Sequence, residues 1–353
     1  MATRNKKKII SIIKVVFPLA IGVYLTWHFY NAMDASTKDI FFKAIKEANY
    51  FWIFLSMSLG FLSHLIRAYR WKYMLEPIGY TTKFWHRYHA MMIGYLVNLL
   101  IPRAGEATRP ALLYQTDKIP FSKSFGTIIA ERMFDLVMLG VIFLATIILS
   151  FDDLIAVKNI IIAGSPENNG ESESNQWILN IIISVIAGGI LLFAILWVKI
   201  EKFRTKITEF IKDVMNGVFA ILKSKNPFQF IFYTILVWVL YLLFFGICFK
   251  AFEQTQNFPI NGVLIGFIAG TFGLMFTSGG IGAYPYLVGI VVIYFIGDQF
   301  EVKEHAEGVG KALGMIIWLS QTIMMILLGL ISLVLLPRNY KKESDDKVGT
   351  NKA

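Results

Sequence analysis

Six charged residues stand inside two otherwise apolar stretches of this sequence. They alternate in sign and are Arg103, Glu106, Arg109, Glu131, Arg132 and Asp135. The first three recur every three residues and cover a helix face of about 120°, and the other three fall within an arc of about 100°. Because charges inside a membrane are costly and normally pair, three cations and three anions predict mutual pairing between the two stretches.

Two kinds of chemistry fit this set of charges. One is a buried ion-pair network that only locks neighbouring helices together. The other is a site for a lipid phosphate or for proton coupling, because a guanidinium group matches phosphate oxygens bidentately. In that case Arg103 and Arg109 bind the phosphate, and the three acidic residues position the arginines or accept protons. The two interpretations are compatible, since a network can hold one arginine ready for substrate.

A second motif is rich in glycine and ends in an aromatic residue. Its members are Ser278, Gly279, Gly280, Gly282 and Tyr284, followed by Pro285. Successive glycines permit positive φ, so their N–H groups can form an anion-binding nest. Small residues in membrane helices also serve close packing, which is the alternative. In the last apolar run, Trp318 and Gln321 share one helix face; Gln321 makes an interhelical hydrogen bond or lines a cavity.

The elements that must position these residues belong to a membrane protein. The 353 residues are 56% apolar and only 16% charged, and the mean hydropathy is +0.58. A soluble domain has about 25% charged residues. We therefore expect an all-α polytopic membrane protein with a single integral membrane domain over 1–353.

Six apolar runs are long enough to cross a bilayer, and two regions are too short. The predicted full spans are 9–30, 50–66, 125–150, 177–198, 228–249 and 312–336. Residues 88–116 and 260–297 each contain a broken helix and are predicted to enter and return on one side. Alternating charged and apolar residues predict an amphipathic interfacial helix at 200–224, and 338–353 is a polar tail.

The charges sort by side under this topology. With the N-terminus cytoplasmic, cytoplasmic segments carry 24 Lys and Arg against 8 acidic residues, and outer loops carry 7 against 13. The positive-inside rule therefore supports both hairpins and places both termini in the cytoplasm. Two broken-helix hairpins of opposite orientation suggest an inverted repeat, which in transporters puts a substrate site near the midplane. We expect the protein in a bacterial cytoplasmic (inner) membrane.

The remaining cysteine, histidine and polar residues form no motif that indicates a specific function. Cys248 is the only cysteine, so an intramolecular disulfide is impossible and a buried core role is expected. The histidines form no metal pattern, and His86 and His89 read as interfacial residues without a carboxylate partner. The polar stretch 151–176 reads as a loop. We expect no cofactor, no metal and no nucleic-acid partner.

At these motifs the sequence resembles the flippase-like transmembrane family named for the lysylphosphatidylglycerol synthase membrane region. The resemblance spans about 10–336 and rests on Asn98, Pro102 to Glu106, Arg109, Glu131, Arg132, Asp135, Gly279 to Gly282, Trp318 and Gln321. Many members have Pro before the glycine pair and Glu after the last glycine, where this chain has Ser278 and Tyr284. A proton or cation role of that Glu therefore does not transfer.

The resemblance implies lipid translocation or service to a lipid-linked pathway. It covers the membrane region only, without a soluble aminoacyltransferase domain. The first hypothesis is a flippase for an anionic phospholipid, an aminoacylated phospholipid or a polyprenyl-phosphate carrier, with no catalytic residues. The alternatives are a membrane-embedded transferase with Glu106 or Asp135 as base, and an accessory subunit. The expected partners are lipids with phosphate head groups, and a lipid-modifying synthase or glycosyltransferase.

Overall fold

The computed structural model describes residues 33–163, 226–300 and 303–350, together with a few isolated positions. Within these ranges the chain forms α- and 3₁₀-helices joined by turns, and no strand occurs among them. Four helical stretches are long and apolar enough to cross a membrane: Tyr50–Ile78, Phe121–Ile161, Pro227–Ala251 and Glu304–Leu336. They match four of the six predicted spans. The predicted spans 9–30 and 177–198 and the interfacial helix 200–224 lie almost wholly outside the described residues.

Helix α3 is longer than the sequence predicted. It follows α2 (Ala35–Glu47) and runs over Tyr50–Arg70, four residues past the predicted end at 66. The Asn49 side chain accepts the Phe51 N–H at 3.1 Å and so caps its N-terminus. Two short helices follow it directly, α4 (Lys72–Leu75) and η1 (Glu76–Ile78). Residues 67–78, which lie beyond the predicted span, are therefore largely helical.

The first predicted hairpin is present as two packed helices, α5 (Phe84–Leu100) and α6 (Ala104–Asp117). The helix breaks at Ile101, because the Pro that follows disfavours helical backbone there. The two arms then touch closely, since a Cβ on Gly105 would lie 1.9 Å from the carbonyl oxygen of Gly94. Any side chain at position 105 would collide with the backbone of α5. Gly105 therefore allows the two arms to pack this closely.

Helix α7 corrects a second expectation. It covers Phe121–Ala163 and changes direction at Ser150, where φ is −152° and ψ is 39°. Residues 151–163, which were expected to form a loop, are thus helical. Asp153 in this part accepts hydrogen bonds from Asn261 Nδ2 at 2.5 Å and Tyr294 Oη at 3.1 Å, and these bonds tie it to α11 and α12.

The second predicted hairpin follows α10 (Pro227–Cys248) and consists of α11 (Ile260–Phe276) and α12 (Ala283–Ile296). The break between the arms contains η4 (Ser278–Gly280). Across this break, Gly279, Gly280 and Gly282 have φ of 63°, 76° and 73°. The glycines are required here because side chains disfavour this backbone region. The remaining 3₁₀-helices are η2 (Phe249–Ala251), η3 (Glu253–Thr255) and η5 (Gly297–Gln299).

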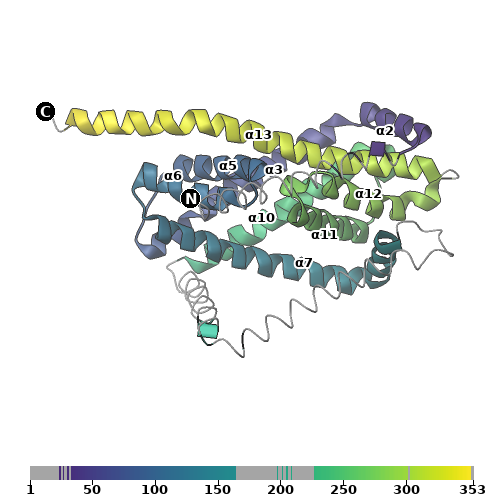
Figure 1. Ribbon diagram of the computed structural model, residues 1–353, viewed down its shortest axis with the longest axis horizontal. Coiled ribbons are helices and arrows are strands. Elements are labelled where there is room, and N and C mark those ends of the chain that lie inside the picture. The colour runs from purple at the N-terminus through teal and green to yellow at the C-terminus, as the bar shows by residue number, and fades with distance from the viewer. Residues whose placement is uncertain are drawn as a thin grey trace, which may run out of the picture.

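The last helix, α13, runs over Lys303–Thr350 and includes most of the predicted polar tail. It packs along α12, α5 and α2, and its far end extends beyond the rest of the molecule (Figure 1). Helix α7 lies on the opposite side, where it contacts α6 and α11. The two hairpins lie between these long helices, and α3 and α10 pack together beside them. Cys248 is buried in this core, as predicted.

Candidate functional site

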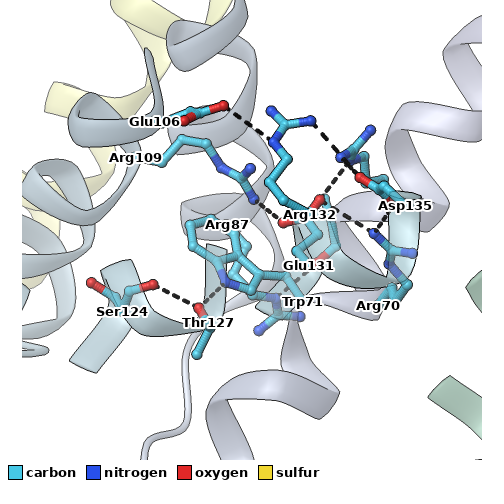
Figure 2. A network of polar contacts seen from close by, with 12 residues as sticks. Arg70, Trp71, Arg87, Glu106, Arg109, Ser124, Thr127, Glu131, Arg132 and Asp135 are labelled. Carbon is cyan, nitrogen blue, oxygen red and sulfur yellow. Dashed lines mark hydrogen bonds and ion pairs between the residues drawn. The ribbon is translucent and has the colours of Figure 1, made fainter. Parts of the chain in front are cut away.

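A cluster of buried charges joins three helices near the start of α7. We call it the charge cluster, and its members are Arg67, Arg70, Arg109, Glu131 and Asp135. Helix α3 supplies the first two arginines, α6 supplies the third, and α7 supplies both carboxylates one turn apart. Figure 2 shows the arginines converging on the two acidic side chains.

Glu131 is the centre of the charge cluster. Its Oε1 accepts hydrogen bonds from Arg67 Nε at 2.6 Å and Arg70 Nη2 at 3.3 Å, and its Oε2 accepts one from Arg109 Nη2 at 2.9 Å. Only 2% of the Glu131 side chain is exposed. One carboxylate therefore holds α3 and α6 against α7, and such charge-assisted bonds are the strong ones in proteins.

Asp135 extends the cluster by one helical turn. Its Oδ2 accepts from Arg67 Nη2 at 2.5 Å, and its Oδ1 accepts from Arg70 Nη2 at 3.3 Å. Arg67 also donates to the Tyr241 hydroxyl oxygen on α10 at 2.9 Å. Both carboxylates of the cluster are thus bound by the same pair of arginines from α3.

Arg109 is held differently from the other two arginines. Its guanidinium carbon lies 4.3 Å from the centre of the Trp71 ring, which is a cation–π contact. Trp71 is itself fixed, because its Nε1 donates to Thr127 Oγ1 at 2.9 Å. Of the nitrogens of Arg109, Nε and Nη1 are buried and have no hydrogen-bond partner among the described residues. Arg109 therefore retains unused donors next to a rigid aromatic surface.

The buried charges do not balance. Three guanidinium groups with at most 7% exposure face two carboxylates with 2% and 12% exposure. Glu106 and Arg132 add a nearby pair at 3.2 Å, and Arg132 Nη1 also lies 3.8 Å from Asp135 Oδ2. Both added side chains are about one-third exposed, and their opposite charges leave the sum unchanged. Each buried charge without a counter-ion is expensive. The charge cluster therefore has one positive charge in excess.

The predicted pairing between the two charged stretches is present in part. Arg109 pairs with Glu131 and Glu106 pairs with Arg132, as expected, whereas Arg103 is exposed at the helix break and forms no ion pair with a described residue. Its φ of 63° is unusual for a residue with a side chain. Asn98 has a structural contact, because its Oδ1 accepts the Gly105 N–H at 2.7 Å and satisfies the start of α6.

The predicted glycine motif forms a separate region. Trp318 Nε1 donates to the Gly279 carbonyl oxygen at 2.8 Å, and Tyr284 is buried against Gly270 and Gly273. A Cβ on Gly279 would lie 2.9 Å from Leu99 Cδ2, so the break of the second hairpin touches the end of α5. No described contact joins this region to the charge cluster directly, and Gln321 forms no hydrogen bond with a described residue.

Sequence reasoning missed Arg67 and Arg70 because the hydropathy run ends before them. A signal was nevertheless present. Small and polar residues recur at Ser56, Gly60 and Ser63, and the two arginines continue the same helix face. All five are buried.

The expectation that His86 and His89 lack a carboxylate partner was wrong for His86. Both are buried, and His86 Nδ1 lies 3.0 Å from Asp117 Oδ1, so the base of the first hairpin does hold a carboxylate partner. His89 Nδ1 contacts Ser332 Oγ at 3.0 Å and links α5 to α13. Both histidines therefore join neighbouring helices.

The comparisons with known proteins agree with the fold. A family model described as the lysylphosphatidylglycerol synthase TM region matches residues 15–300. A UPF0104 membrane protein of Methanocaldococcus jannaschii is 28% identical over 37% of this chain and 37% of its own length. Another, from Methanothermobacter thermautotrophicus, is 21% identical over 71% of this chain and 77% of its own. No solved structure matches. The matched region contains both hairpins and the charge cluster, and the chain belongs to the lysylphosphatidylglycerol synthase TM region family.

Proposed function

We propose that this protein translocates a phosphate-bearing lipid across the bilayer. The lipid classes are an anionic phospholipid, an aminoacylated phospholipid or a polyprenyl-phosphate carrier. One observation carries the proposal: the excess positive charge of the charge cluster, with two unused donors on Arg109. A phosphate group supplies both the missing negative charge and acceptors for those donors.

The proposed role of each residue follows from its present contacts. Arg109 binds the phosphate through the nitrogens that have no protein partner, and Trp71 keeps its guanidinium plane in place. Glu131 and Asp135 hold Arg67 and Arg70 and set the local charge. Translocation needs no bond to be made or broken, so no catalytic residue is assigned.

Lipid movement also needs a path between the two leaflets. We propose that the two hairpins are the halves of an inverted repeat and enter the membrane from opposite sides. Each has a 17-residue arm followed by a 14-residue arm, and the contact of Leu99 with Gly279 joins their breaks. In transporters, broken helices of this kind meet at the substrate site. The glycine break acts as the outer gate, and both termini face the cytoplasm of a bacterial inner membrane.

The family description favours a second candidate. It denotes the membrane region of a synthase, and a chain of this family can act as the membrane partner of a lipid-modifying synthase or glycosyltransferase made separately. In that case purified protein moves no lipid by itself, and activity in a lipid-modification assay requires the second protein. Co-purification with such a synthase and transport only in its presence would favour this candidate over the first.

The direct test is reconstitution of the full chain into liposomes with fluorescent phospholipids. Movement is followed by chemical quenching of the outer leaflet. We expect Arg109→Gln to slow transport roughly tenfold or more, because a charge-assisted contact is worth about 1.5–3 kcal/mol. Lys123→Gln, which changes an exposed lysine at the start of α7, is the matched control and should keep the wild-type rate. Equal rates for wild type and a folded Arg109→Gln protein contradict the proposal.

A further inference from the structure

An open pocket of about 330 Å³ lies where α3 turns through α4 and η1 into α5. Its polar lining includes Tyr69, Lys72, Glu76, Tyr80, Thr82 and Arg87. None of these residues belongs to the charge cluster. The pocket is close to it along the chain, however, because Arg70 and Trp71 lie between two of the lining residues.

Arg87 is the most deeply placed cation of this pocket, with 3% exposure. Its Nε donates to the Ala68 carbonyl oxygen at 3.0 Å, and its Nη1 donates to the carbonyl and hydroxyl oxygens of Thr82 at 2.5 and 2.6 Å. These bonds fix the guanidinium group but contribute no negative charge. No carboxylate of the described chain forms an ion pair with Arg87, and Nη2 makes no hydrogen bond to a described residue.

Lys72 adds a second cation, and its partner is weak. Its Nζ lies 3.7 Å from Glu76 Oε1, and both side chains are more than one-third exposed. Such exposed pairs contribute little to stability and exchange readily with water. The lining itself holds two cations and one carboxylate, and Asp117 acts on Arg87 from beside the pocket. Hydroxyl groups from Tyr69, Tyr80 and Thr82 complete the lining.

We propose that this pocket binds the phosphate group of a hydroxyl-bearing phosphate ester. Arg87 and Lys72 bind the phosphate oxygens, and the tyrosine and threonine hydroxyls bind the hydroxyls of the esterified alcohol. The volume accommodates a phosphate with a small polyol and is too small for acyl chains. The same chemistry occurs on a lipid head group and on a soluble sugar or glycerol phosphate. This second site stands whether or not the protein moves lipid.

Aromatic residues around the pocket are consistent with the depth of lipid head groups. Tyr69, Tyr73 and Tyr233 pack edge to face or stack with each other, and Trp85 at the start of α5 is 54% exposed. Tyrosine and tryptophan are enriched where a membrane meets water. The sequence places this end of α3 and α5 on the cytoplasmic side. A lipid of the inner leaflet therefore presents its phosphate at the right level.

A purely structural role explains Arg87 but not Lys72. The bonds from Arg87 to Ala68 and Thr82 join α5 to α3, so its loss can damage the fold without involving a ligand. Within the described part of the chain, Lys72 makes only the weak pair with Glu76 and cation–π contacts with Tyr69 and Tyr73, at 5.8 and 5.6 Å. Lys72 is therefore the residue that tests the proposal, and Arg87→Lys is the second, conservative variant.

The experiment measures binding to the purified full chain in detergent. The probes are sn-glycerol 3-phosphate and inorganic phosphate in solution, and micelles doped with phosphatidylglycerol or, as the phosphate-free counterpart, diacylglycerol. We expect the phosphate-bearing probes to bind, and we expect Lys72→Gln to lower their affinity roughly tenfold. Arg87→Lys removes the planar guanidinium group that binds phosphate bidentately, and it is expected to lower the affinity as well. Lys123→Gln is the matched control with an exposed lysine outside the pocket.

The pattern of binding identifies the source of the phosphate. Binding of doped micelles without binding of glycerol phosphate assigns the pocket to a lipid head group, and the reverse assigns it to a soluble ester. The proposal is overturned if diacylglycerol binds as well as phosphatidylglycerol and the soluble probes do not bind. It is also overturned if Lys72→Gln and Lys123→Gln have equal effects. The liposome assay with Arg109→Gln is read separately, so either proposal can fail alone.

Discussion

The two hairpins have the same lengths and different chemistry. Helices α5 and α11 each contain 17 residues, and helices α6 and α12 each contain 14. The second arm of the first hairpin contains Glu106, Arg109 and Asp117, whereas the second arm of the other hairpin is uncharged. Both breaks use positive φ, at Arg103 in the first hairpin and at three glycines in the second.

This difference shows how one architecture can be stabilised in two ways. The charged arm depends on groups outside its hairpin, because Arg109 needs Glu131 on α7 and Trp71 next to α3. The uncharged arm depends on close backbone contact, since Tyr284 packs directly on Gly273. The first hairpin is therefore held by charge pairing, and the second by close backbone packing. The predictions below test this division.

The largest expected effect is in the charge cluster. Glu131→Gln leaves three buried guanidinium groups with one carboxylate, and breaking a buried ion pair in this way costs about 3–5 kcal/mol. We expect a large fall in the thermal unfolding temperature of the detergent-solubilised protein. Glu106→Gln is the matched control, because its pair is one-third exposed and worth about 1 kcal/mol or less. Similar losses for both variants contradict the central role of Glu131.

The second-largest expected effect is at the positions where the two arms of each hairpin pack closest together. Gly105→Ala places a Cβ 1.9 Å from the Gly94 carbonyl oxygen, and Gly273→Ala places one 2.8 Å from the Tyr284 backbone. Overpacking costs about 1–3 kcal/mol, and we expect Gly105→Ala to be the more severe. Gly140→Ala on α7, where a Cβ meets nothing within 4 Å, should be neutral or slightly stabilising. Thermal unfolding of the three variants gives the order, and a reversed order refutes the geometry.

The smallest effect concerns the glycine break. Trp318→Phe removes the hydrogen bond from Nε1 to the Gly279 carbonyl oxygen while keeping an aromatic side chain. We expect a loss of about 1 kcal/mol in the free energy of unfolding. If the break acts as a gate, the same variant also raises the lipid flux of reconstituted protein. Unchanged stability and unchanged flux together would show that this hydrogen bond does not secure the break.

Much of the fold was predictable from local signals. The two hairpins, at 84–117 and 260–296, agree with the predicted 88–116 and 260–297 to within a few residues. Pro102 and the glycines mark their breaks. The predicted end of α3 was too early. Hydropathy penalises every arginine in the same way, whether or not the fold provides a carboxylate partner for it. In the fold Arg67 and Arg70 have Glu131 and Asp135 as partners, from more than 60 positions along the chain.

The candidate site was predictable only where both partners stood out. Arg109 and Glu131 are charges within apolar runs, so their pairing could be expected. Trp71 looked like one more aromatic residue near a membrane boundary, and nothing in its neighbours indicates that it lies under Arg109. His86 was judged against nearby sequence, whereas Asp117 lies 31 positions away and reaches it only because the hairpin folds back.

The distance along the chain between Arg67 and Glu131 also sets an order of assembly. The two residues are 64 positions apart, which corresponds to roughly 3–13 s of synthesis at about 5–20 residues per second. Until α7 is made, the arginines of α3 lack the two carboxylates that bind them in the folded protein. The buried ion pairs at the end of α3 can therefore form only after α7 has been synthesised, so a later helix completes the packing of an earlier one.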